Sequence, residues 1–60
     1  MQKIIYADFS GHNVLTREYR PRRNLYRMTI GGWYAGAFTA DTDTEALDIF
    51  KRRLREEGNA

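Results

Sequence analysis

The adjacent residues Gly31 and Gly32 constrain the fold of this chain more than any other feature. They stand between two runs in which apolar or aromatic residues alternate with smaller or polar ones. Two neighbouring glycines supply the positive φ angles that a type I′ hairpin turn requires. We therefore predict a β-hairpin in which Ile30 lies opposite Trp33.

This register gives the predicted hairpin two distinct faces, because side chains alternate along a strand. It pairs Met28 with Ala35 and Tyr26 with Ala37. The face expected to pack in the core consists of Tyr26, Met28, Ile30, Trp33, Ala35 and Ala37. The face expected to stay open consists of Leu25, Arg27, Thr29, Tyr34, Gly36 and Phe38. Phe38 lies near the strand end, and we expect it to turn inward and to be partly buried.

The other elements follow from composition and turn residues. Segments rich in β-branched and aromatic residues predict strands over 3–9 and 14–19, with turn-like residues between them. The segment 20–24 is predicted to be a loop because Pro21 lacks a backbone donor. The hairpin strands are expected over 25–30 and 33–39.

A C-terminal helix is predicted over 43–57. Thr42 and Glu45 have the spacing of a capping box, in which each side chain accepts a hydrogen bond from a backbone amide near the other. Ala46, Leu47, Phe50 and Leu54 recur at helical spacing and form one apolar stripe. The expected fold class is α+β: a small antiparallel β-meander of three or four strands packed by one C-terminal α-helix.

The length and composition limit the classes of protein that fit. Sixty residues predict a single domain near the lower limit for independent folding. The absence of cysteine excludes a disulfide framework and a thiolate metal site. The apolar run at the start is short and interrupted by polar residues, so we expect a cytoplasmic protein with no membrane span.

No catalytic or metal-binding motif is recognised, and we expect neither an enzyme nor a cofactor. His12 lies in a predicted turn without a partner at a catalytic spacing, and Ser10 has no nucleophile context. The acids from Asp41 to Glu45 fail as a calcium loop, because Ala46 stands where that loop needs glycine.

The charge pattern points to a basic surface. The formal net charge is only +2, but the segment from Arg17 to Arg27 contains five arginines, counting both ends. Arginine binds phosphate oxygens and guanine edges through two parallel hydrogen bonds, and a two-stranded ribbon fits the major groove. The predicted DNA-binding residues are Arg20, Arg22, Arg23, Arg27, Thr29 and Tyr34. Arg17 is expected to extend the same guanidinium surface.

From Asn24 onward, the chain resembles a small group of DNA-binding domains. The residues that carry the resemblance are Asn24-Leu25-Tyr26-Arg27, Gly31-Gly32-Trp33-Tyr34, and Gly36-Ala37-Phe38-Thr39 followed by Thr42, Glu45 and Ala46. The group comprises the three-stranded sheet plus helix domains at integrase amino termini and the plant APETALA-type domains. The resemblance implies that the sheet face away from the helix enters the major groove, with Arg27, Thr29 and Tyr34 at the matching positions. A stand-alone accessory factor of a phage or mobile element would fit.

Two other functions stay open at this stage. A protein-interaction module, such as a phage-type inhibitor or a homodimerising domain, would use Leu25, Tyr34 and Phe38 as its contact. Single-stranded RNA would require a pair of stacked strand aromatics that is incomplete here.

Overall fold

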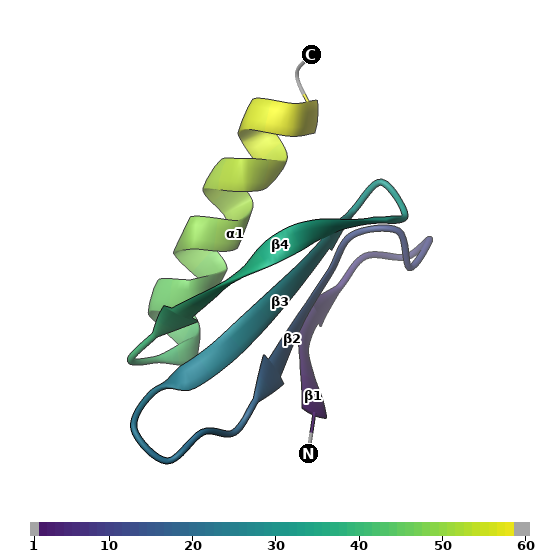
Figure 1. The fold of residues 1–60 in the computed structure, drawn as a ribbon. Coiled ribbons are helices and arrows are strands. Elements are labelled where there is room, and N and C mark those ends of the chain that lie inside the picture. Colours follow the sequence, from purple (N-terminus) through teal and green to yellow (C-terminus); the bar gives the residue numbers. More distant parts are fainter. Residues whose placement is uncertain (1, 59–60) are drawn as a thin grey trace.

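A computed structural model describes residues 2–58 as a four-stranded sheet covered on one face by one helix (Figure 1). The strands are β1 (Gln2–Ala7), β2 (Val14–Glu18), β3 (Asn24–Ile30) and β4 (Trp33–Ala40), and the helix is α1 (Asp43–Gly58). These bounds differ from the expected ranges by at most two residues. All neighbouring strands are antiparallel in the order β1-β2-β3-β4. The predicted α+β meander with a C-terminal helix is confirmed, with four strands.

The predicted β3–β4 hairpin forms, but its register holds only next to the turn. Ile30 lies opposite Trp33 as predicted, and Gly31 and Gly32 have φ angles of 64° and 87°. A β-bulge then places Ala35 as an extra residue. The bulge reverses the alternation over the rest of β4.

The bulge corrects the pairing and the faces predicted for the second half of β4. Met28 lies opposite Gly36 instead of Ala35, and Tyr26 lies opposite Phe38 instead of Ala37. Ala37 is exposed, whereas Phe38 is half-buried and stacks on the Tyr26 ring with centroids 5.5 Å apart. The partial burial expected of Phe38 is confirmed, and its cause is the bulge.

The helix begins with the predicted cap and covers one sheet face with its apolar stripe. The Glu45 amide donates to Oγ1 of Thr42 at 3.1 Å, while the Glu45 carboxylate accepts from the Asp41 amide at 3.3 Å. The fully or nearly buried side chains are Leu15, Tyr26, Met28, Ala40, Ala46 and Phe50. Leu47 and Leu54 pack against this core. The core thus lies between α1 and strands β1 to β4.

Trp33 is not part of the core, contrary to the prediction. Its pairing with Ile30 places it on the helix side of the sheet, but it is 79% exposed. Figure 1 shows α1 diverging from β3 and β4 towards its C-terminus. Towards this end of β4, Arg53 of α1 donates a hydrogen bond to the Ala35 carbonyl at 3.4 Å. Trp33 lies beyond that contact, so nothing in the described chain covers it.

The turns at this end of the sheet are joined by hydrogen bonds. The Gly32 amide donates to the His12 carbonyl at 2.9 Å, and the Gly31 amide donates to Oδ1 of Asn13 at 3.0 Å. Asn13 in turn donates to the Asp8 carboxylate from both its backbone and its side chain. These contacts fix the β1–β2 turn against the β3–β4 turn.

Candidate nucleic-acid interface

The sheet face opposite α1 is uncovered and carries the three predicted strand positions. Thr29 and Arg27 alternate with the buried Met28 on β3, so both side chains lie on the uncovered face. Tyr34 pairs with Thr29 before the bulge and is 66% exposed on the same face. The bulge therefore leaves this part of the predicted surface intact. The structure brings Arg27, Thr29 and Tyr34 onto one side of the β3–β4 ribbon.

Glu18 orients two of the predicted arginines. It lies on β2 opposite Leu25, and its Oε1 accepts hydrogen bonds from Arg27 at 2.8 Å and from Arg20 at 3.2 Å. The bond from Arg27, followed by the positive charges of Arg20 and Arg27, lowers the pKa of the Glu18 carboxyl. Glu18 is therefore ionised near neutral pH. It holds the Arg20 and Arg27 guanidiniums on the uncovered face.

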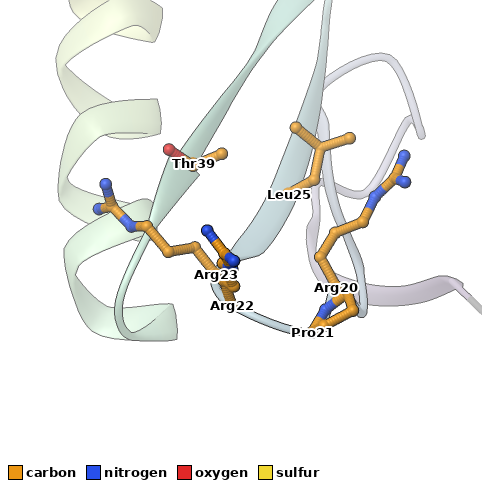
Figure 2. A pocket seen from close by; sticks show the side chains of 6 residues that line it. All are labelled: Arg20, Pro21, Arg22, Arg23, Leu25 and Thr39. Atoms are coloured by element: carbon orange, nitrogen blue, oxygen red, sulfur yellow. The ribbon is translucent and has the colours of Figure 1, made fainter.

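The loop arginines surround a hollow at one end of this face (Figure 2). The hollow has a volume of about 620 Å³ and is lined by Arg20, Pro21, Arg22, Arg23, Leu25 and Thr39. In Figure 2, Leu25 and Thr39 extend from neighbouring strands above the loop that carries the three arginines. The alternation of β3 and β4 explains this position, because Leu25 pairs with Thr39 on the uncovered face.

The charged groups around this hollow differ in their partners. Arg23 pairs with Asp41 at 3.1 Å, and Arg20 pairs with Glu18. Among residues 2–58, Arg22 forms no ion pair, and it is exposed. Two of the loop arginines are thus oriented by carboxylates, while the third is available to an anion.

Arg17 does not belong to this surface, contrary to the prediction. It lies opposite Tyr26, on the helix side of the sheet, and its guanidinium contacts the Asp43 carboxylate at 2.8 Å. Asp43 also accepts a 2.6 Å hydrogen bond from the Tyr26 hydroxyl. The Tyr26 bond and then Arg17 lower the pKa of the Asp43 carboxyl. Arg17 is therefore a structural residue that links β2 to the start of α1.

Sequence reasoning missed the contribution of Thr39 and Leu25 to the hollow. The predicted open face includes Leu25, but only as part of a protein contact. It does not include Thr39, because the predicted alternation of β4 has no bulge. Gly36 was the signal that could have revealed this, since a glycine inside a strand often marks a bulge, and its φ angle of 120° is one that residues with a side chain rarely adopt.

The uncovered face carries groups whose chemistry suits phosphate oxygens and polar base edges. The guanidiniums of Arg20, Arg22 and Arg23 can donate paired hydrogen bonds to phosphate oxygens. The hydroxyls of Thr29 and Tyr34 can donate to or accept from polar base edges. Within residues 2–58, no three His, Cys, Asp or Glu side chains gather in a way that could hold a metal ion.

The comparisons with known proteins identify no relative of this chain. No family model, curated protein or solved structure matches it. Within the described residues, no helix is long and apolar enough to cross a membrane.

Proposed function

We propose that this protein is a non-enzymatic DNA-binding module that docks its uncovered sheet face on duplex DNA. The observation that carries the proposal is the position of the loop arginines beside the uncovered β3–β4 ribbon. Arg20, Arg22 and Arg23 line one end of the face on which Arg27, Thr29 and Tyr34 lie. Duplex DNA carries regularly spaced phosphates beside grooves about as wide as a two-stranded ribbon.

The topology supports entry of the ribbon into a groove. β4 is an edge strand, so the β3–β4 ribbon has one free side. Tyr34 and Thr29 lie next to the turn, and Arg27 lies two residues further along β3. In this arrangement the strand residues contact base edges, while the loop arginines contact the phosphates that flank the groove.

Two acidic side chains reduce the positive charge of the proposed DNA-binding face without cancelling it. Four arginines occupy the proposed face, and two carboxylates, those of Glu18 and Asp41, pair with three of them. Each of these ion pairs is at least partly exposed, and exposed pairs contribute little energy. A DNA phosphate can therefore compete with Asp41 for Arg23 at small cost.

The test is the salt dependence of duplex binding, measured by fluorescence anisotropy. A labelled duplex of about 20 base pairs is titrated at salt concentrations between about 50 and 200 mM. We expect the affinity to fall linearly on a log–log plot. Replacing both Arg22 and Arg23 by alanine should reduce the slope by about 1.8, or about 0.9 for each lost phosphate contact.

The matched control replaces two arginines of the helix. Arg52 and Arg55 are exposed on α1, which covers the opposite sheet face. The variant Arg52→Ala with Arg55→Ala loses the same charge as the loop variant but should leave the slope unchanged. The proposal would be contradicted if both variants reduced the salt slope equally, or if the unsubstituted protein did not bind the duplex at low salt.

A second candidate is a protein-interaction module that uses the same uncovered face. The observation that favours it is the exposure of two large side chains there, Ile4 at 63% and Tyr34 at 66%. Exposed aromatic and apolar side chains beside arginine are typical of protein interfaces. Phe38 does not contribute, because it packs on Tyr26. Self-association in sedimentation experiments that disappears with Tyr34→Glu would favour this candidate over DNA.

A further inference from the structure

We infer that the hollow between the 20–23 loop and the Leu25–Thr39 pair holds one unpaired nucleotide at the end of a bound duplex. This inference rests on the proposed function and adds a ligand to one part of the same surface. It would make the protein selective for DNA that has a single-stranded extension over DNA with blunt ends.

The size of the hollow exceeds what a phosphate contact needs. Its volume of about 620 Å³ lies in the range of about 300–1,000 Å³ that is typical of small-molecule sites. A volume in this range leaves room for a ligand larger than a phosphate group.

The lining matches both parts of a nucleotide. Pro21 and Leu25 supply apolar surface for the flat face of a base, and the guanidinium plane of an arginine can stack on the same base. Thr39 presents an exposed hydroxyl that can bind a base edge. Arg22, which forms no ion pair within the described residues, is available for the phosphate.

Carboxylates lie beside two of the arginines that line the hollow. Glu18 orients Arg20 on one side, and Asp41 orients Arg23 on the other. A site in which the groups are positioned before the ligand arrives loses less entropy on binding.

The position of the hollow explains why the nucleotide would be unpaired. Leu25 lies four residues from Thr29 on β3, which corresponds to about 13 Å along a strand. If the axis of a duplex docked over Thr29 and Tyr34 runs along β3, the duplex reaches the hollow after about four base steps of 3.4 Å. A base that remains paired cannot enter the hollow, whereas a base in a single-stranded extension can.

The first experiment compares two labelled DNAs with identical paired sequences, one blunt and one with a two-nucleotide extension. We expect roughly five- to tenfold tighter binding of the extended DNA, in line with one stacked base. Thr39→Tyr fills the hollow and should abolish this preference, measured as the ratio of the two affinities for the same variant. The control Thr44→Tyr places the same side chain on an exposed position of α1 and should keep the preference.

The second experiment titrates the ¹⁵N-labelled protein with a 5′-phosphorylated dinucleotide and follows the backbone amide signals. We expect saturable shifts at Arg22, Leu25 and Thr39 that inorganic phosphate at the same concentration does not reproduce. Equal shifts with inorganic phosphate would overturn the inference and leave only an anion site.

Equal affinity for blunt and extended DNA would also overturn the inference. The proposed function would still stand in that case if replacing Arg22 and Arg23 reduced the salt dependence of duplex binding. Loss of all blunt-duplex binding, with the dinucleotide shifts kept, would instead contradict the proposed function and support the hollow as a nucleotide site.

Discussion

The Tyr26 hydroxyl donates a 2.6 Å hydrogen bond to Oδ1 of Asp43, and this bond joins the middle of the sheet to the first residue of the helix. Tyr26 is fully buried, and Asn24 donates to the same hydroxyl oxygen at 3.3 Å. Arg17 completes the group through the Asp43 carboxylate. The position of α1 on the sheet therefore depends on a polar contact as well as on its apolar stripe.

Removal of the Tyr26 hydroxyl should destabilise the protein. Tyr26→Phe keeps the ring and its stacking on Phe38 but deletes the hydrogen bond to an ionised acceptor, at a cost of about 1–2 kcal/mol. Urea unfolding followed by circular dichroism measures the change. Tyr34→Phe is the matched control, because its ring is exposed and its loss of a hydroxyl should change stability by less than about 0.5 kcal/mol. Equal effects of the two substitutions would be inconsistent with the Tyr26–Asp43 contact.

Acid should weaken the fold partly through Asp43. Its pKa in the folded protein lies below the ordinary value of 3.8, because the Tyr26 hydroxyl and then Arg17 stabilise the carboxylate. The stabilisation is thus fully present above the unfolded pKa and is lost as the pH falls through the folded value. Urea midpoints measured from about pH 6 down to about pH 2 should decline below about pH 4. Asp43→Asn should lower the midpoint at pH 6 and flatten the decline, with the remainder due to Asp8 and Glu18, whose pKa values are also lowered.

Phe50 should be the most sensitive apolar position of the helix. It is fully buried and contacts the Tyr6 ring, with centroids 5.6 Å apart. Phe50→Ala should cost about 3–5 kcal/mol, which is comparable to the whole stability expected of so small a core. Ile49 is half-buried and lies outside the core cluster, so Ile49→Ala is the control and should still unfold cooperatively. If Phe50→Ala unfolded at the same temperature as the unsubstituted protein, the packing of Phe50 in the core would be refuted.

Gly36 should resist substitution because of its backbone conformation. Its φ angle is 120°, although a methyl group there would meet no atom closer than Met28 Cε at 3.9 Å. The penalty of Gly36→Ala therefore comes from backbone strain, about 1–3 kcal/mol. Gly31→Asn serves for comparison, because a φ of 64° is one that asparagine tolerates. Thermal denaturation should show a clear loss of stability for Gly36→Ala and a small loss for Gly31→Asn. The reverse order would contradict the backbone conformation described for Gly36.

Trp33 should behave as a surface residue. It is the one tryptophan of the chain, so its fluorescence reports on this position alone. We expect the native protein to emit close to the wavelength of the unfolded protein and to be quenched readily by iodide. Trp33→Ser should change the free energy of unfolding by less than about 0.5 kcal/mol. A blue-shifted emission that is protected from iodide would mean that the helix covers this end of the sheet.

Residues that act locally, in turns and caps, were enough to predict the strands and the helix. The strand register beyond the turn and the partners of charged side chains depend on contacts between distant residues, and these were not predicted. The double glycine and the Thr42–Glu45 cap act within a few residues, and both were correctly recognised. The bulge at Ala35 changed the face of every later residue in β4, because alternation has a period of two. The contact of Arg17 with Asp43 spans 26 positions and could not be predicted from charge spacing.

The candidate site was predictable to the extent that it depends on β3 and the loop. Arg27, Thr29 and Tyr34 share a face because the register next to the turn was right. The hollow was not foreseen, because it requires the shifted register that brings Thr39 beside Leu25. Trp33 was wrongly placed because the sheet extends further than the helix that covers it.

The hydrogen bonds between the two turns have a kinetic consequence. The tips of paired hairpins commonly open first, and their amides then exchange with solvent before those of the strand centres. In this protein the amides of Gly31 and Gly32 are bound to the neighbouring turn. Deuterium uptake should therefore be slow at an end of the sheet that the helix leaves bare, and the two hairpins should open together rather than one after the other.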